Sequence, residues 1–238
     1  MDINMNGENC LKKMRKNSLS EYKAVIFDLD GTLYYQKPFR IKMALYLVKY
    51  VITHPKSVSD IFLIKKYREV RENWEMCEKE MVFNQDMSLD DRQYEYVAQK
   101  KNVGAEKVKK AVTFFMLDAP LSLLPRFRDE ILTSQINILR ENKVKVVVYS
   151  DYPVENKLKA LGIEADYCFT SADENISSMK PDPKGLAYIM QVLKLSKDDI
   201  IMIGDRYEKD GLAAINNDVD YIIVSSSKEE REKEWLSN

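Results

Sequence analysis

Residues 24–33 read Ala24-Val25-Ile26-Phe27-Asp28-Leu29-Asp30-Gly31-Thr32-Leu33. The first half is apolar and rich in β-branched residues, without a helical period, and so predicts a buried strand of a parallel sheet. Because side chains alternate along an extended backbone, Asp28 and Asp30 point the same way and crowd two carboxylates together. A divalent cation between them would relieve the repulsion, and Mg²⁺ prefers oxygen ligands of this kind.

The residues after these acids suit a phosphate site, although a turn is an alternative. Gly31 lets the chain turn where a side chain would obstruct, and the Thr32 hydroxyl could hold a phosphate or its neighbours. Asp and Gly are also common turn residues, so this stretch taken alone could simply end a strand. The choice between the two depends on what the rest of the chain supplies.

Composition excludes several classes of protein. The chain has 238 residues and a formal net charge of -1, from 37 basic and 38 acidic residues, which predicts no nucleic-acid partner and no anionic membrane surface. Hydrophobic residues make up 45% and charged residues 32%, as in a globular protein. No apolar run approaches the roughly 18 residues of a membrane span, and the amino terminus lacks the apolar segment of a secretory signal. We therefore expect a cytoplasmic protein.

Cysteine and histidine usage argues against a disulfide framework, a zinc site and a histidine base. Cys10, Cys77 and Cys168 are odd in number and scattered, without a CxxC pair. The single histidine, His54, precedes Pro55 and has no acidic or nucleophilic neighbour in sequence, so it reads as part of a helix end.

The hydrophobic pattern divides the chain into a tail, a core and an inserted helical domain. Residues 1–20 are polar and basic and predict a loose tail or a peripheral helical turn. Residues 39–121 follow a 3.6-residue period and predict an all-helical bundle inserted into a core made of residues 21–38 and 122–238. The expected inward stripe of the first helix is Ile41, Ala44, Leu45, Val48, Val51 and Ile52, and that of the second is Leu63, Tyr67, Val70, Trp74, Cys77 and Met81.

The core predicts an α/β fold with a three-layer parallel sheet. Strand patterns at residues 24–27, 144–149, 167–170, 200–203 and 221–224 alternate with helical patterns. This alternation is typical of strands joined by right-handed helical crossovers, as in a Rossmann-like fold.

Polar residues follow the predicted strands. They are Asp28, Asp30, Ser150 with Asp151, Asp205 and Asp210, and Lys180 lies on a proline-rich loop that leads into a helix. In an open parallel sheet, ligands bind beyond the carboxyl ends of the strands. Each residue alone could be a turn, a helix cap or a solvated loop residue. Their convergence at one edge is harder to explain by turn chemistry, and it predicts a catalytic site.

The order and spacing of these segments resemble the four motifs of the haloacid dehalogenase superfamily. The motifs are Asp28-Leu29-Asp30-Gly31-Thr32, then Ser150, then Lys180, then Gly204-Asp205 through Asp210. The resemblance covers roughly residues 22 to 224 and includes a helical cap inserted after the first motif. It implies a Rossmann-like core with its active site at the strand ends.

The resemblance also implies a role for each motif residue. Asp28 would attack phosphorus and form an aspartyl-phosphate, and Asp30 would protonate the leaving oxygen and then activate water. Lys180 would neutralise negative charge, while the phosphate-binding residues would be Thr32, Ser150, Asp151 and Lys180. Mg²⁺ would be held by the Asp28 carboxylate, the Asp30 backbone carbonyl and the Asp205 carboxylate, with Asp210 either a further ligand or in contact with the ligands.

Asp30 narrows the expected reaction. Members of the superfamily that displace halide from carbon lack an acid at this place, because halide needs no protonation. The leading hypothesis is therefore a Mg²⁺-dependent phosphatase acting on a small phosphorylated metabolite, which the helical cap would select. A sugar phosphomutase of the same fold would share every catalytic residue, and a protein that binds phosphate or a partner without turnover is a third interpretation. The sequence predicts no particular oligomeric state.

Overall fold

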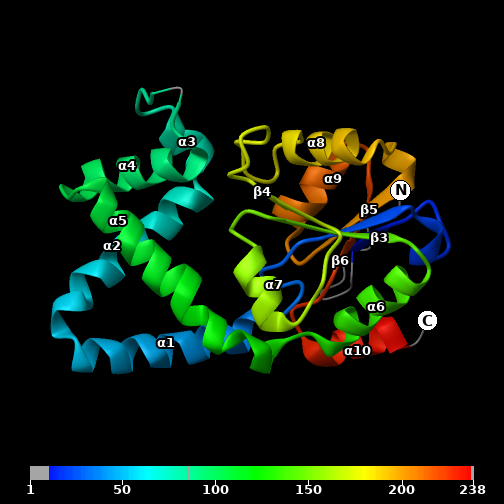
Figure 1. The fold of residues 1–238 in the computed structure, drawn as a ribbon, viewed down its shortest axis with the longest axis horizontal. Helices are drawn as coiled ribbons and strands as arrows, with labels where there is room; N and C mark the ends of the chain where they lie inside the picture. The colour runs from blue at the N-terminus through cyan, green and yellow to red at the C-terminus, as the bar shows by residue number, and fades with distance from the viewer. Residues whose placement is uncertain (1–10, 85, 237–238) are drawn as a thin grey trace. The chain divides into compact units, whose positions relative to one another are not determined.

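The computed structural model describes residues 11–84 and 86–236, and the chain divides into two compact units. One unit joins the described residues up to Pro38 with those from Pro125 onward, and the other is Phe39–Leu124. The first contains the sheet and every predicted site residue. The second is helical (Figure 1).

The sheet has six strands in the order β1-β6-β5-β2-β3-β4. Its parallel strands are β2 (Ala24–Phe27), β3 (Lys145–Ser150), β4 (Tyr167–Thr170), β5 (Ile200–Gly204) and β6 (Asp220–Ile223), while β1 (Leu11–Lys13) runs antiparallel to β6. Every side chain of β2 and β5 is buried, as the unbroken apolar runs predicted for strands covered on both faces. The α/β class and the Rossmann-like sheet are thereby confirmed.

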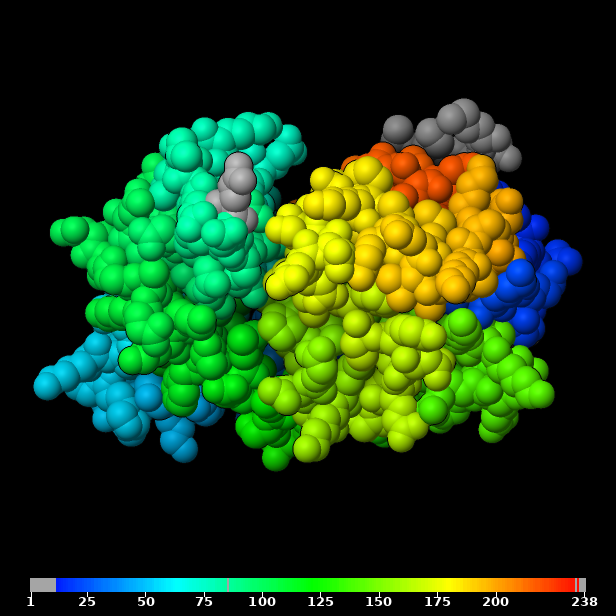
Figure 2. All heavy atoms as spheres, turned by 45° about the horizontal axis from the view of Figure 1, so that its top comes forward, coloured from blue at the N-terminus to red at the C-terminus, as the bar shows by residue number. Residues whose placement is uncertain are grey.

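Helices cover both faces of this sheet. On one face, α8 (Lys184–Leu193) and α9 (Leu212–Asn216) pack on alternate residues of the central strands, such as Ile26, Val147 and Met202. Figure 2 shows the α8 segment, yellow to orange, covering the near side of the sheet unit. On the other face lie α6 (Glu130–Glu141) and α10 (Lys228–Leu236) (Figure 1). The short α7 (Glu155–Leu161) follows β3 and ends at Gly162, which has a left-handed conformation.

Strand register sets which residues meet at the carboxyl edge. Phe27 at the end of β2 pairs with Val148 of β3 on one side and with Ile203 of β5 on the other. The backbone amide of Asp28 continues this ladder by donating to the Ile203 carbonyl oxygen, with an N···O distance of 2.8 Å. The residues that directly follow β2 and β5, and Ser150 at the end of β3, are consequently brought to one edge.

The amino-terminal prediction of a loose tail or a helical turn is wrong for residues 11–13, whereas residues 19–21 do form a helical turn. Residues 11–13 form a sheet strand, with Leu11 paired to Ile223 and Lys13 to Tyr221, and a 3₁₀ turn follows at Leu19–Glu21. The predicted loose tail overlooked this strand because its three residues, two of them lysines, carry too few apolar positions to show alternation. Residues 1–10 lie outside the described part of the chain.

The second unit is built from helices. These are α1 (Gln36–Thr53, which begins in the first unit), α2 (Val58–Glu72), α3 (Trp74–Glu78), α4 (Leu89–Lys101) and α5 (Ala105–Val112), followed by a π-helical turn at Thr113–Asp118. Short 3₁₀ turns are found at Pro55–Ser57, Ala119–Ser122 and Leu124–Phe127. Ser88 caps α4, because its hydroxyl accepts a hydrogen bond from the Asp91 amide.

Two predicted helical stripes differ from the structure. Ile41, Leu45, Val48 and Ile52 of α1 were expected to face inward but are 59–75% exposed. Periodicity identifies an apolar face without showing that a neighbour covers it. The second stripe is divided at Asn73, where α2 ends and α3 begins, although Leu63, Tyr67, Val70 and Trp74 are buried as predicted.

The remaining sequence features are unremarkable in the structure. Cys77 and Cys168 are free thiols, and Cys10 lies outside the described residues. The exposed His54 stacks on Tyr50 with ring centroids 4.3 Å apart and touches the Thr53 hydroxyl through Nδ1. None of the helices in residues 11–84 and 86–236 combines the length and the apolar character needed to cross a bilayer.

Candidate active site

Three carboxylates meet at the carboxyl edge of the sheet. Asp28 follows β2, Asp205 follows β5, and Asp210 lies in the π-helical turn Tyr207–Gly211 after β5. One carboxylate oxygen from each of them lies within 4.8 Å of the others. Asp28 and Asp210 are buried, and Asp205 is partly buried.

Two glycines make room for this cluster. Gly31 has φ +106°, and a Cβ built there would lie 2.1 Å from Asp205 Oδ2. A Cβ at Gly204 would lie 2.3 Å from the Asp210 side chain. Gly31 is thus needed for its left-handed conformation and for the close approach of Asp205, whereas Gly204 is needed for space alone.

Lys180 is buried among these acids. Its Nζ donates to Asp28 Oδ1 and to Asp210 Oδ1, both at 2.6 Å, and lies 5.3 Å from the centroid of the Tyr149 ring. The backbone amide of Lys180 donates to Asp151 Oδ1 at 3.1 Å, and the Ser171 hydroxyl donates to the same oxygen. Asp151 therefore holds the loop that delivers Lys180.

Two hydroxyls complete this part of the site. Thr32 is fully buried and its hydroxyl donates to Asp28 Oδ2 at 3.0 Å, which fixes the orientation of that carboxylate. The Ser150 hydroxyl oxygen accepts from the Tyr152 amide at 3.1 Å, which leaves its hydrogen to be donated. Ser150 is 1% exposed and lies at the end of β3.

Crowding of the carboxylates changes their protonation. Burial raises the pKa of Asp28 well above its ordinary 3.8, with repulsion from Asp210 and Asp205 adding to the effect and Lys180 opposing it. Burial and the charge of Asp210 raise the pKa of Asp205 to about 7. Burial lowers the pKa of Lys180, but the charges of Asp210 and Asp28 outweigh it, so the pKa rises and the ammonium form is held.

The Asp30 side chain lies at the same strand end but contacts different residues from those of the acidic cluster. Its Oδ1 and Oδ2 each accept from Lys157 Nζ at 2.7 Å, and the Tyr34 hydroxyl donates to Oδ1 at 2.6 Å. Burial would raise the pKa of Asp30, but the Lys157 charge and the hydrogen bonds from Lys157 and Tyr34 outweigh it, so the pKa is lowered. Its backbone carbonyl oxygen accepts from Gln36 Nε2 at 3.3 Å, and a metal contact through that atom stays a prediction.

Sequence reasoning missed Lys157 and Tyr34. Lys157 lies four residues before Leu161 on the buried face of α7, and a lysine at an apolar position of a short helix is a recognisable signal. Tyr34 lies four residues after Asp30 and just beyond the glycine turn, which marks it only as part of the first motif.

The acidic cluster fits a divalent cation. Its carboxylate oxygens are the ligands that Mg²⁺ prefers, and their mutual repulsion would be relieved by two positive charges. Asp28, Asp205 and Asp210 would hold such an ion.

Comparison with known proteins agrees with this geometry. Residues 22–218 match the family of haloacid dehalogenase-like hydrolases. The chain belongs to this family. The match includes every motif residue from Asp28 to Asp210, and it confirms the resemblance that the sequence motifs indicated.

Solved structures of haloacid dehalogenase-like proteins share this fold. The 2-haloacid dehalogenase of Pseudomonas syringae pv. Tomato DC3000 has 15% sequence identity and a TM-score of 0.57, with 84% of this chain and 85% of that chain covered. The hydrolase YfnB of Bacillus subtilis, solved with bound magnesium, has 15% identity and a TM-score of 0.57, with 84% and 87% covered. No curated protein sequence matches the chain.

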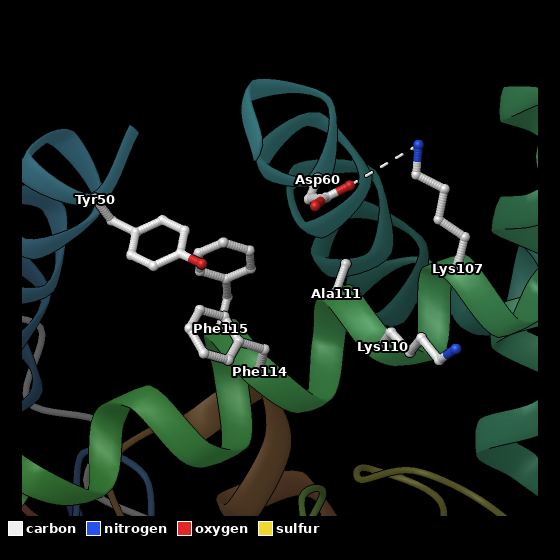
Figure 3. A pocket seen from close by; sticks show the side chains of 7 residues that line it. All are labelled: Tyr50, Asp60, Lys107, Lys110, Ala111, Phe114 and Phe115. Atoms are coloured by element: carbon white, nitrogen blue, oxygen red, sulfur yellow. Dashed lines mark ion pairs between the residues drawn. The ribbon is translucent and has the colours of Figure 1, made fainter. Parts of the chain in front are cut away.

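The helical unit contains a cavity of its own, of about 470 Å³. It is lined by Tyr50, Asp60, Lys107, Lys110, Ala111, Phe114 and Phe115 (Figure 3). Asp60 and Lys107 form an ion pair across it at 3.9 Å, and the Tyr50 and Phe115 rings meet edge to face. None of these residues belongs to the predicted phosphoryl site.

Proposed function

We propose that this hydrolase is a Mg²⁺-dependent phosphatase that acts on a small phosphomonoester. The observation that carries the proposal is Asp30, a carboxyl two residues after the nucleophile candidate that Lys157 and Tyr34 hold at the same strand end. Cleavage of a phosphate ester leaves an alkoxide that needs a proton, whereas release of halide needs none. A member of the family with an intact acid at this place is therefore better suited to esters than to haloacids.

Asp28 and Asp30 carry out the two chemical steps of the proposed reaction. Asp28 forms a bond to phosphorus while the bond from phosphorus to the leaving oxygen breaks, and Asp30 gives that oxygen a proton. Because Lys157 and Tyr34 lower the pKa of Asp30 in the free protein, Asp30 must take up this proton together with the substrate. Water then attacks phosphorus as ionised Asp30 takes one of its protons, and inorganic phosphate leaves with Asp28 regenerated. Bound Mg²⁺, held by Asp28, Asp205 and Asp210, would supply positive charge that lets the phosphate dianion approach an anionic carboxylate.

The other polar residues support these two carboxylates. Lys180 keeps its positive charge against Asp28 and would also attract the phosphoryl oxygens. Ser150 would donate its hydroxyl hydrogen to a phosphoryl oxygen. We assign Thr32 to orienting Asp28, because its hydroxyl already donates to that carboxylate. We assign Asp151 to positioning Lys180, because its Oδ1 accepts from the Lys180 amide and the Ser171 hydroxyl.

The test is phosphate release from a panel of sugar phosphates, nucleotides and phosphoglycolate, with Mg²⁺ and with a chelator. We expect metal-dependent release that falls by on the order of 10⁴-fold or more in Asp28→Asn. The isosteric amide keeps the shape of the side chain, so near-wild-type circular dichroism should accompany the loss. Activity retained by Asp28→Asn would contradict the assignment of the nucleophile.

Three further assays separate the alternatives. Halide release from 2-chloropropionate that persists in Asp30→Asn would identify a dehalogenase instead. Isomerised phosphosugar without free phosphate would identify a phosphomutase. Phosphate binding without turnover of any substrate would favour a binding protein.

A further inference from the structure

Lys157 is a buried cation that the family's four motifs do not include. It lies on α7, seven residues after Ser150, and its side chain is 8% exposed. Lysine is rarely buried, because removing its ammonium from water is costly unless it gains compensating contacts. Some feature of the site must therefore compensate for its position.

Among the described residues, the contacts shown for the Lys157 ammonium are with Asp30 and with the ring of Tyr152. Nζ lies 2.7 Å from both Asp30 oxygens and 5.2 Å from the centroid of the Tyr152 ring. Tyr34 contributes a second donor to Oδ1. A carboxylate oxygen has about two lone-pair sites, so Oδ1 is filled by two donors, whereas Oδ2, which accepts from Lys157, keeps a site for another partner.

Helix stability does not explain a lysine at this position. Lys157 lies in the first turn of α7, where the helix dipole favours acidic side chains and disfavours cations. Replacing a buried ion pair by apolar residues is often neutral or stabilising, so the pair is weak evidence of a role in folding. Lys159, two residues on in the same helix, is exposed as surface lysines normally are.

We propose that Lys157 is a positioning residue that, with Tyr34, clamps the Asp30 carboxylate so that Oδ2 serves the leaving group and then the attacking water. The inference rests on the proposed phosphatase activity. The proton moves as described above, from Asp30 to the leaving oxygen and from water back to Asp30, and Lys157 itself neither gains nor loses one. A carboxylate free to rotate would less often present an oxygen in line with these protons.

This role predicts a dependence on the leaving group. p-Nitrophenolate is stable as an anion and departs with little help from an acid, whereas phenolate needs more. Lys157→Gln should lower kcat/KM for phenyl phosphate by about 10²-fold, the lower end of what a positioned acid contributes. The loss of kcat/KM for p-nitrophenyl phosphate should be smaller by about tenfold or more, because this leaving group depends less on an acid. Lys159→Gln is the matched control and should change neither value.

A double-mutant cycle keeps the inference testable if the single variant does not fold. Asp30→Asn with Lys157→Gln replaces the ion pair by a neutral pair of amides. Because Lys157 acts through Asp30, the double variant should be no slower on phenyl phosphate than Asp30→Asn alone. A further loss in the double variant, or equal losses on both esters in Lys157→Gln, would overturn the positioning role. A wild-type protein without activity on either ester would instead count against the phosphatase proposal.

Discussion

The charge balance at Lys180 explains why this strand end suits a metal ion. Its ammonium contacts Asp28 and Asp210 at equal distances, and Asp205 lies in the same acidic cluster. When the three carboxylates are ionised, this cluster of four side chains carries two net negative charges. A single divalent cation would neutralise them, and without it one or more carboxyls hold a proton.

Asp205 should make metal binding depend on pH. Its pKa of about 7 in the metal-free protein means that Mg²⁺ must displace a proton from it below neutrality. Lowering the pH from 8 to 6 should weaken Mg²⁺ binding by about tenfold, following the ionised fraction of such a group. Isothermal titration calorimetry in buffers of different ionisation enthalpy measures both the affinity and the proton release.

The variant Asp205→Ala tests the role of the same carboxylate in metal binding by removing it. Loss of a ligand should raise the Mg²⁺ concentration required for activity by at least about 10- to 100-fold. The remaining pH dependence of binding should flatten between pH 6 and 8. An unchanged metal requirement would show that Asp205 does not hold the ion.

At the scale of single residues, the sequence predicts the site residues that directly follow a strand. It does not predict the side chains that reach the site from other elements. Asp28, Ser150 and Asp205 could be located because each ends or follows an apolar strand. Lys157 could not be assigned to Asp30, since the two are 127 residues apart in sequence and meet only in the folded sheet. The orientation of Thr32 toward Asp28 likewise required the structure.

Among the elements, α10 holds the loop that carries the first motif. Arg231 is fully buried and donates to the backbone carbonyl oxygens of Gly31 and Thr32. It also pairs with Asp129 at 2.6 Å, while the other oxygen of Asp129 caps the amino end of α6. One side chain thus ties two helices to the turn after β2.

Arg231→Met should destabilise the protein strongly. Asp129 would be left as a buried charge without its cation, and the carbonyl oxygens of Gly31, Thr32 and Ser225 would lose their donor. Removing one partner of such a pair typically lowers the free energy of unfolding by about 3–5 kcal/mol. Lys233→Met, an exposed change on the same helix, should stay within about 0.5 kcal/mol. Denaturant unfolding of both variants measures the difference, and equal stabilities would contradict the role given to Arg231.

Element boundaries were less predictable than element types. The run from Leu63 to Met81 looked continuous in sequence, yet the helix ends before Asn73 and a new one begins at Trp74. The antiparallel strand Leu11–Lys13 escaped detection because pairing with β6, rather than its own composition, makes it a strand. Tertiary contacts decide such short elements.

For the whole molecule, the acidic cluster couples stability to pH and to metal. Asp28 and Asp205 have raised pKa values in the fold, so the stability linked to their protons is fully present below their unfolded pKa near 3.8. That stability is lost as the pH rises through the folded pKa of each group, which is about 7 for Asp205. Mg²⁺ would bind the ionised form and should restore the lost stability. At 100 times its dissociation constant, Mg²⁺ should add about 2.7 kcal/mol.

Thermal unfolding with and without Mg²⁺ checks this coupling. The Mg²⁺ concentration is about 5 mM, on the order of the millimolar dissociation constants of weak oxygen-ligand sites. Adding Mg²⁺ should raise the melting temperature more at pH 8 than at pH 6. Asp205→Ala is the control and should lose most of the increase. A metal effect that is independent of pH would show that the carboxyls are already ionised at pH 6.

The short strand β1 also determines how the molecule meets its neighbours. It covers the outer edge of β6, and the Arg15 amide and Tyr22 hydroxyl both donate to Asp220 at 2.6 Å to hold that segment in place. An uncovered edge strand has a row of unpaired amides and carbonyls that can pair with a strand of another molecule. Trimming the protein back to Tyr22 would expose this edge of β6, and we therefore expect the shortened protein to aggregate more readily.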